Sequence, residues 1–322
     1  CLLKVWAVKM ITIAYHDGTL ENEKQVLWAE RLTARLKHIR LVPLSAPHAE
    51  DADIALVWRP PAGRLRQLNQ LRLIISLGQG VDHLFNDPHL PDNVPVVRLV
   101  DPNMSHALSH WVILALLDHL RDGPAYRLAA AERRFESLPQ RQTAQMPVAV
   151  YGLGAIGSVI AHRLAALGFA VQGWSRRPRD LGRSIQTHHG DQGFQNIVSA
   201  CIAHVCILPL TAHTTNLFSA DVFAAMPAGS YFINAGRGHQ VEEDALLNAV
   251  RTGHLAGAAL DVFVEEPLPD THPFWKETRI AIWPHVAAQT NPDTAADQVA
   301  QAISTVLAGG QPEHIVDKFR GY

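Results

Sequence analysis

Short apolar runs alternate with helical stretches along most of the chain. In the first third, runs at 10–15 and 51–58 predict strands, and the segment 64–78 predicts a short helix followed by a third strand. The stretch 21–36 predicts an amphipathic helix. The side chains expected on its buried side are Val26, Leu27, Leu32 and Leu36. This alternation is typical of parallel strands joined by helices.

The same rhythm starts again after a long predicted helix over 104–122, which ends at a Gly-Pro pair. Six short apolar runs follow between 147 and 288. They are PVAVYG, FAVQGWS, HVCILPL, SYFINAG, GAALDVF and IAIWPH. Six strands are the number in a doubly wound dinucleotide-binding domain. A last helix is predicted to end near Leu307.

The second series is complete between 111 and 288, so the residues after 288 need another place to pack. The simplest solution returns the C-terminal helix to the first domain. One domain then comprises residues 1–110 and 289–322, and the other comprises 111–288. Two crossings of the chain predict a hinge, with a cleft between the domains.

Composition narrows the class of protein. The chain has 322 residues, 48 % hydrophobic and 18 % charged, with a formal net charge of −2. That balance gives no general attraction for nucleic acid or for an anionic membrane surface. No apolar run reaches the ~18 residues that a membrane span requires. The three cysteines, Cys1, Cys201 and Cys206, lack a second pair to complete a zinc site and indicate free thiols in a reducing compartment. We therefore expect a cytoplasmic protein that holds no metal.

The segment GLGAIG at 152–157 fits a phosphate-binding glycine turn, because it follows a predicted strand and opens a predicted helix. Gly152 permits the tight turn, Gly154 lets backbone N–H groups approach a pyrophosphate, and Gly157 lets the helix lie against the sheet. Ala155 and Ile156 begin the helix, whose positive end favours an anion. A glycine loop for another cofactor, as in a methyltransferase, is the alternative.

The next predicted strand ends in Ser175, Arg176 and Arg177, where an NAD site would place an acid for the ribose hydroxyl. A carboxylate would repel a 2′-phosphate, whereas guanidinium groups pair with it. Arginines at a strand end are commonly only solvated surface. At this corner of a dinucleotide fold they favour NADP(H), with NADPH preferred over NADH.

Three polar side chains follow the ends of the later strands: Arg237, Glu266 and His285. Each alone could be ordinary surface, but ligands of open α/β sheets bind beyond the carboxyl ends of the strands, where all three are expected. Reduction of a ketone needs a proton donor, which protonated His285 can be. Glu266 can orient the imidazole, and Arg237 can polarise a carbonyl or hold a carboxylate. The nicotinamide would supply the hydride, so no metal is needed.

The segments GLGAIG, NAGRG, LDVFVEEPLP and PHVAA, in this order and spacing, resemble the D-isomer-specific 2-hydroxyacid dehydrogenases. Within that family GWSRRP, LVWRPP, SLGQGVDHL and the ending VDKFRGY resemble the glyoxylate/hydroxypyruvate reductase A branch. The resemblance implies an α/β fold of two Rossmann-like doubly wound parallel-sheet domains. The flavodoxin-like one (1–110 and 289–322) would bind substrate, and the Rossmann domain (111–288) would bind NAD(P).

The resemblance also assigns residues. The implied catalytic triad is Arg237, Glu266 and His285, with Glu266 chosen over Glu265 by its distance from Asp261 in the family pattern. Further implied cofactor contacts are Leu208, Pro209, Ala235 and Asp261, with Asp261 near the nicotinamide amide. The implied substrate contacts are Trp58, the backbone N–H groups of Gln79 and Gly80, and Arg237. The family is typically dimeric through its cofactor domain, so a homodimer is expected.

Two departures from the family pattern bear on the substrate. Trp283 stands where a Thr is common before the Pro-His pair, and Phe135 where a Trp is common in a loop expected to reach a partner subunit. The leading interpretation is an NADPH-dependent reductase of glyoxylate and hydroxypyruvate. A dehydrogenase of a bulkier 2-oxo acid and a nucleotide-sensing regulator without catalysis are the alternatives.

Overall fold

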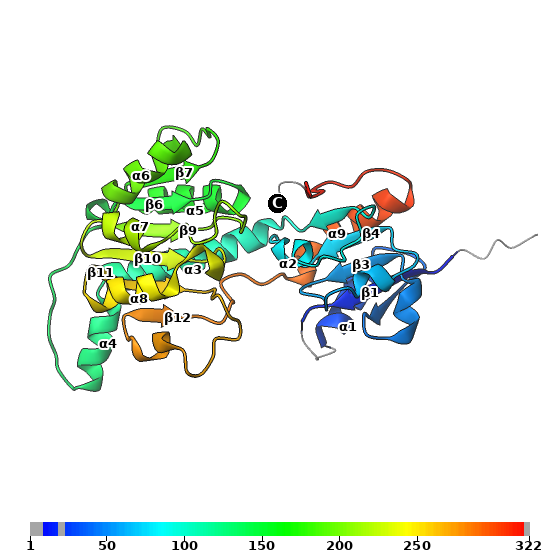
Figure 1. Ribbon diagram of the computed structural model, residues 1–322, viewed down its shortest axis with the longest axis horizontal. Helices are drawn as coiled ribbons and strands as arrows, with labels where there is room; N and C mark the ends of the chain where they lie inside the picture. Colours follow the sequence, from blue (N-terminus) through cyan, green and yellow to red (C-terminus); the bar gives the residue numbers. More distant parts are fainter. Residues whose placement is uncertain (1–8, 19–22, 319–322) are drawn as a thin grey trace, which may run out of the picture. The chain divides into compact units, whose positions relative to one another are not determined.

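The computed structural model describes residues 9–18 and 23–318, and the chain divides into two compact α/β units (Figure 1). The first unit comprises residues 1–103 and 290–322, and the second comprises residues 104–289. The sequence places the first boundary later, at 110/111. Helix α3 (Pro102–Leu120) begins at the observed boundary and packs into the core of the second unit, so all but its first two residues belong to that unit.

The first unit contains a five-stranded parallel sheet in the order β2-β1-β3-β4-β5, the flavodoxin-like arrangement. Its strands are β1 (Ile11–His16), β2 (Ile39–Pro43), β3 (Ile54–Val57), β4 (Leu73–Ser76) and β5 (Val96–Arg98). The sequence predicts only the three central ones. The two edge strands escape prediction because β2 buries a single residue and β5 has only three residues.

Helices cover both faces of this sheet. They are α1 (Glu23–Thr33), α2 (Asp82–Phe85) and α9 (Pro292–Leu307), with 3-10 segments at Pro47–Asp51 and Leu65–Gln67. Helices α1 and α9 pack together on one face, so the C-terminal helix returns to this unit. In α1 the buried side chains are Trp28 and Leu32, whereas Val26 is exposed, contrary to the sequence prediction. The buried side of α1 is the side that packs against α9.

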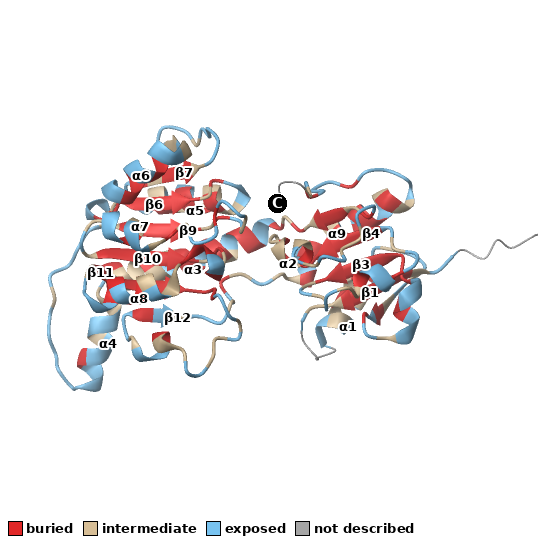
Figure 2. Ribbon diagram, viewed as in Figure 1, coloured by how far each residue is buried: buried red, intermediate tan, exposed pale blue. Residues whose placement is uncertain are grey.

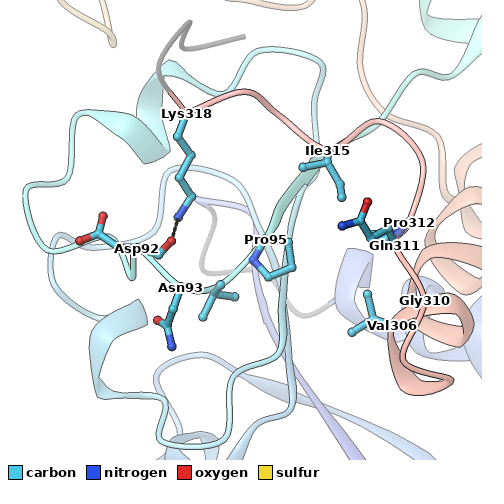
Figure 3. A pocket seen from close by; sticks show the side chains of 10 residues that line it. Asp92, Asn93, Pro95, Val306, Gly310, Gln311, Pro312, Ile315 and Lys318 are labelled. Carbon is cyan, nitrogen blue, oxygen red and sulfur yellow. Dashed lines mark hydrogen bonds between the residues drawn. The ribbon is translucent and has the colours of Figure 1, made fainter.

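The C-terminal segment runs beside β5, where the Val316 N–H donates to the Val96 carbonyl at 2.8 Å. The Lys318 ammonium donates to the Pro91 and Asp92 carbonyls at 2.8 and 2.7 Å. A shallow pocket of about 420 Å³ lies between this segment and 92–95 (Figure 3). Because 92–95 precedes β5, the pocket lies at the amino end of the strands, away from the edge where ligands of such sheets bind.

The second unit contains a seven-stranded parallel sheet in the order β12-β11-β10-β9-β6-β7-β8. Its strands are β6 (Val148–Tyr151), β7 (Val171–Ser175), β8 (Ile185–His189), β9 (Ala203–Cys206), β10 (Ser230–Asn234), β11 (Leu255–Leu260) and β12 (Ile280–Ile282). The predicted six strands all occur. The seventh, β8, was missed because its sequence IQTHH is polar and only Ile185 is buried.

Helices flank this sheet on both sides, with the buried residues concentrated on the strands (Figure 2). Helices α3 and α5 contribute to one core, and α6, α7 and α8 to the other. Besides α3, the helices are α4 (Gly123–Ala131), α5 (Ala155–Ala166), α6 (Gly190–Ala200), α7 (Ala220–Ala225) and α8 (Glu243–Arg251). Short 3-10 segments lie at Thr143–Gln145, Gly238–Gln240 and Pro273–Lys276. The doubly wound parallel-sheet prediction is confirmed for both units.

Cys201 and Cys206 are buried free thiols, and Cys1 lies outside the described residues. Within the described ranges, no helix has the length and apolar character needed to cross a membrane.

One histidine of the second unit, His204, is fully buried, and a second, His119, is partly buried. The Tyr151 hydroxyl is 2.9 Å from His204 Nδ1, and the ring of His119 stacks on Tyr231 at 4.1 Å. His204 Nε2 has no hydrogen-bond partner among the described residues. Burial lowers the pKa of His204 to about 3, and burial, aided by the charge of Arg141, lowers that of His119 to about 4.

These shifts predict loss of stability in acid. A histidine with a depressed folded-state pKa is fully compatible with the fold above its unfolded value of ~6.5. Below that pH the unfolded chain binds a proton that the folded chain refuses, so stability falls by about 1.4 kcal/mol per pH unit for each such histidine. This loss continues down to the folded value, about 3 for His204.

We expect His204→Gln to lower the number of protons taken up on unfolding by about one between pH 5 and 6.5, and so to flatten the dependence of the unfolding free energy on pH. Urea unfolding followed by tryptophan fluorescence, repeated from pH 5 to 7.5, measures the slope in wild type and variant. Equal slopes would show that His204 does not carry this acid sensitivity.

Candidate active site

Six neighbouring strands of the second unit end at one edge, and each ends in predicted site residues. Because all the strands are parallel, their carboxyl ends meet there. Gly152 follows β6, Ser175 ends β7, Leu208 and Pro209 follow β9, Ala235 and Arg237 follow β10, Asp261 and Glu266 follow β11, and His285 follows β12. The topology thus gathers the predicted cofactor and catalytic residues of this unit along one edge.

The glycine turn is built by close contacts. Gly152 has a φ of +105°, and a Cβ there would lie 2.9 Å from the Ile207 carbonyl oxygen. A Cβ on Gly157 would lie only 1.7 Å from the Gly152 carbonyl oxygen, so the helix can approach the turn only with glycine at this position. Two of the three glycines are therefore needed by the fold itself.

Gly154 differs, because a Cβ there would meet no protein atom within 4 Å. It is the N-cap of α5, whose first turn begins with Ala155, Ile156 and Gly157 and carries no acidic residue. N–H groups of a helix start, beside open space and without a competing carboxylate, suit an anion. These residues fit the pyrophosphate of a dinucleotide.

A pair of substitutions separates ligand binding from folding. Gly154→Ala keeps an ordinary φ of −78° and fills open space, so we expect unchanged thermal unfolding. NADPH affinity should fall at least tenfold, since the methyl group occupies the space offered to phosphate. Gly157→Ala should lower the unfolding temperature without any ligand. Thermal melts and NADPH fluorescence titration test both; an unchanged NADPH affinity in Gly154→Ala would contradict this role of the turn.

The end of β7 is joined to the glycine turn, because the Gly152 N–H donates to the Trp174 carbonyl at 2.8 Å. Ser175 Oγ donates to the Arg177 carbonyl at 2.7 Å, which fixes the backbone of the next two residues. Arg176 and Arg177 are exposed at this corner. The structure therefore places both guanidinium groups on the loop that directly follows the strand beside the glycine turn.

His285 and Glu266 form a hydrogen-bonded pair, with Nδ1 2.9 Å from Oε2. The other carboxylate oxygen, Oε1, accepts from the Phe263 N–H at 3.0 Å, which fixes the carboxylate. The neighbouring Glu265 is exposed. A carboxylate at Nδ1 orients the ring, so that Nε2 is the nitrogen able to deliver a proton.

The backbone of His285 has a φ of +56°, an uncommon value for a residue with a side chain. Asp261 holds the following residues: its Oδ1 accepts from the N–H groups of Val286 and Ala287 at 2.8 and 3.0 Å. Burial raises the pKa of this carboxyl. Asp261 therefore fixes the turn that carries His285, while its predicted contact with the nicotinamide amide stays a prediction.

The ring of Trp283 packs edge-on against that of Trp111, with the ring centroids 6.1 Å apart. Packing within the second unit therefore explains part of the role of this bulky residue.

Arg237 lies on a loop that packs against the loop of Glu266. A Cβ on Gly238 would lie 1.9 Å from the carbonyl carbon of Phe263, the residue whose N–H binds Glu266. Arg237 Nη1 donates to the Gly236 carbonyl at 2.8 Å. The glycine after Arg237 thus allows the two loops to touch, and the three predicted catalytic residues lie on consecutive, mutually supported loops.

Two supporting residues were missed by the sequence analysis. Asn234 Oδ1 accepts from the Gly236 N–H, and its Nδ2 donates to the Arg237 carbonyl, both at 3.0 Å. Asn two residues before Gly is a recognisable turn signal and could have been found. The second, Gln240, contacts atoms far away in sequence, which no local pattern indicates.

In the first unit, the predicted substrate residues follow β3 and β4. Ser76 Oγ accepts from the Gly78 N–H at 3.3 Å and donates to the Gly80 carbonyl at 3.2 Å, which shapes the loop of Gln79. A Cβ on Gly78 would lie 2.7 Å from the ring of Trp58. Trp58 therefore packs directly on this loop, and its role as a wall for substrate stays a prediction.

The chain is similar to a known protein family and to named relatives over most of its length. The family model described as "D-isomer specific 2-hydroxyacid dehydrogenase, NAD binding domain" matches residues 113–287. A protein named glyoxylate/hydroxypyruvate reductase A from Yersinia enterocolitica is 34% identical over 300 residues, covering 92% of this chain and 96% of the relative. One of the same name from Serratia proteamaculans is 34% identical over 318 residues, covering 97% and 100%.

Two solved structures are similar over nearly the whole chain. A D-isomer specific 2-hydroxyacid dehydrogenase from Xanthobacter autotrophicus Py2, in complex with NADPH and MES, has a TM-score of 0.88 and 38% identity, covering 96% of this chain and 99% of that one. An NADPH-dependent glyoxylate/hydroxypyruvate reductase from Sinorhizobium meliloti, in complex with NADP and sulfate, has a TM-score of 0.89 and 32% identity, covering 97% and 100%.

Proposed function

Because the chain belongs to the D-isomer-specific 2-hydroxyacid dehydrogenase family, in the glyoxylate/hydroxypyruvate reductase A branch, we propose that it reduces small 2-oxo acids with NADPH. The substrates are glyoxylate, reduced to glycolate, and hydroxypyruvate, reduced to D-glycerate. The observation that carries this proposal is the 2.9 Å pair of His285 and Glu266 at the sheet edge that also holds the glycine turn. The names of the relatives support the choice of substrate.

A bound NADPH supplies the hydride for this reaction. His285 gives a proton from Nε2 to the oxygen of the substrate carbonyl, and Glu266 stabilises the imidazolium through Nδ1. Arg237 offers a guanidinium to the substrate carboxylate or carbonyl. Asp261 keeps the His285 turn in place through two backbone N–H groups.

The cofactor is held by residues of the second unit. The helix start at Gly154 binds the pyrophosphate, and Arg176 and Arg177 with Ser175 bind the 2′-phosphate that distinguishes NADPH from NADH. The remaining contacts proposed for the cofactor are Leu208, Pro209, Ala235 and Asp261. The structures of relatives with NADPH and NADP support this choice.

Residues of the first unit complete the substrate contacts in this proposal. The backbone N–H groups of Gln79 and Gly80 bind the substrate carboxylate, as a helix start or turn does for other anions, and Trp58 limits the substrate size. We also propose a homodimer formed through the second unit. The 57% exposure of Leu128 on α4 and the full exposure of Phe135 after it support a partner contact in this region.

Turnover tests the proposal. Purified protein should oxidise NADPH, read at 340 nm, on addition of glyoxylate or hydroxypyruvate, and more slowly with NADH. Activity only with larger 2-oxo acids would favour the dehydrogenase of a bulkier substrate. NADPH binding without turnover of any 2-oxo acid in a panel would overturn the enzymatic function and favour a nucleotide-sensing regulator.

A further inference from the structure

Gln240 ends the 3-10 segment Gly238–Gln240, three residues after Arg237, and is completely buried. Its carboxamide lies between two loops of the candidate active site. Nε2 donates to the carbonyls of Leu208 and Pro209 at 2.8 and 3.1 Å. Oε1 accepts from the Arg237 N–H at 2.9 Å and from Cys206 Sγ at 3.2 Å. One side chain thus joins the loop after β9 to the backbone of Arg237.

The carboxamide uses its full hydrogen-bonding capacity, since a primary amide has two N–H donors and an oxygen with two lone pairs. The surroundings also fix its orientation. Two carbonyl oxygens require donors on one side, and an N–H and a thiol require an acceptor on the other. A flipped amide would face oxygen with oxygen and N–H with N–H. No other uncharged side chain of this length offers both a double donor and a double acceptor.

The Gln240 side chain continues the connection between strands β9 and β10 past the end of their backbone pairing. Strands β9 and β10 pair as far as Asn234 and Cys206, and the Ala235 N–H still donates to the Cys206 carbonyl at 3.1 Å. Beyond that point the strand pairing ends, and the Gln240 carboxamide joins the two loops through its bonds to Leu208, Pro209 and Arg237. Gly236 leaves room for it, because a Cβ there would lie 2.4 Å from Gln240 Oε1.

We propose that Gln240 is a positioning residue that sets Arg237 against the Leu208–Pro209 loop. This inference rests on the proposed function, in which Arg237 binds the oxo acid and the Leu208–Pro209 loop contacts the cofactor. Gln240 touches neither ligand. Its carboxamide keeps the backbone that carries the Arg237 guanidinium and the cofactor loop at a fixed spacing, so its loss should affect the KM for both ligands.

Two substitutions test the proposal. Gln240→Met keeps the length and removes all four hydrogen bonds. We expect it to raise the KM for glyoxylate and for NADPH together, and to lower kcat/KM for glyoxylate by at least tenfold at temperatures well below unfolding. As a matched control, Gln298→Met breaks bonds to Val100 N–H and the Arg98 carbonyl in the first unit. It should change both KM values by less than twofold.

Gln240→Glu should make kcat/KM depend on pH, which a general loss of stability would not do. A protonated carboxyl can still donate to one carbonyl of the Leu208–Pro209 loop, whereas a carboxylate faces both carbonyls without a donor. The kcat/KM of Gln240→Glu relative to wild type should therefore fall as the pH rises, while the ratio for Gln240→Met stays flat.

The outcomes separate this inference from the proposed function. An inactive wild-type protein would refute the function. Active wild type with unchanged KM values in folded Gln240→Met would overturn the positioning role. A flat pH ratio for Gln240→Glu, or failure of both variants to fold, would likewise assign Gln240 to structure alone.

Discussion

His285→Asn is expected to lower kcat for glyoxylate reduction by about 10²–10⁴-fold, the contribution typical of a positioned general acid. NADPH affinity should stay within about threefold of wild type, because the glycine turn and the β7 end are untouched. Asn is the preferred replacement because His285 has a φ of +56°, which Asn tolerates better than Ala. The loss then reflects the missing proton donor and not a displaced backbone.

The chain offers a matched control for this experiment. His272 Nε2 lies 3.4 Å from Glu243, so it is a second histidine paired with a carboxylate in the same unit. His272→Asn should leave kcat within about threefold of wild type. Stopped-flow measurement of NADPH oxidation and fluorescence titration of NADPH give the two quantities. Equal loss of turnover and of NADPH binding in His285→Asn would contradict a role as the acid.

The double substitution Arg176→Ala with Arg177→Ala is expected to reverse or abolish the preference for NADPH. A hydrogen bond to a charged group contributes about 1.5–3 kcal/mol, and 1.4 kcal/mol is a factor of ten in affinity. Losing one phosphate bond from each arginine should weaken NADPH by about 100-fold or more. NADH lacks the 2′-phosphate, so its affinity should change by less than about threefold.

Arg179→Ala with Arg183→Ala is the control, because it removes the same charge from the same exposed loop. If the positive charge of the loop alone attracts NADPH, both double variants should lower the NADPH affinity equally. If direct contacts decide, only the first pair changes the ratio of NADPH to NADH affinity. Isothermal titration with each cofactor measures that ratio, and an unchanged ratio in the first pair would show that Arg176 and Arg177 do not bind the 2′-phosphate.

Much of the site follows from the order of motifs along the chain. Once the strands are known to be parallel, residues that follow successive strands must meet at one edge. The sequence alone therefore places four residues in one region: Gly152, Arg237, Glu266 and His285. The edge strands β2, β5 and β8 could not be predicted, because each is short or polar and buries few side chains, so it lacks the periodicity that marks a strand.

The sequence by itself determined the parallel α/β architecture, the glycine turn and the identity of the charged residues at the strand ends, because these depend on local patterns. Only the tertiary structure decided which atoms meet. It showed Glu266 and not Glu265 against His285, Asp261 on the backbone of the His285 turn, and Gln240 between two loops. Such contacts join segments far apart in the chain, and close packing of whole elements, which no local pattern records, brings them together.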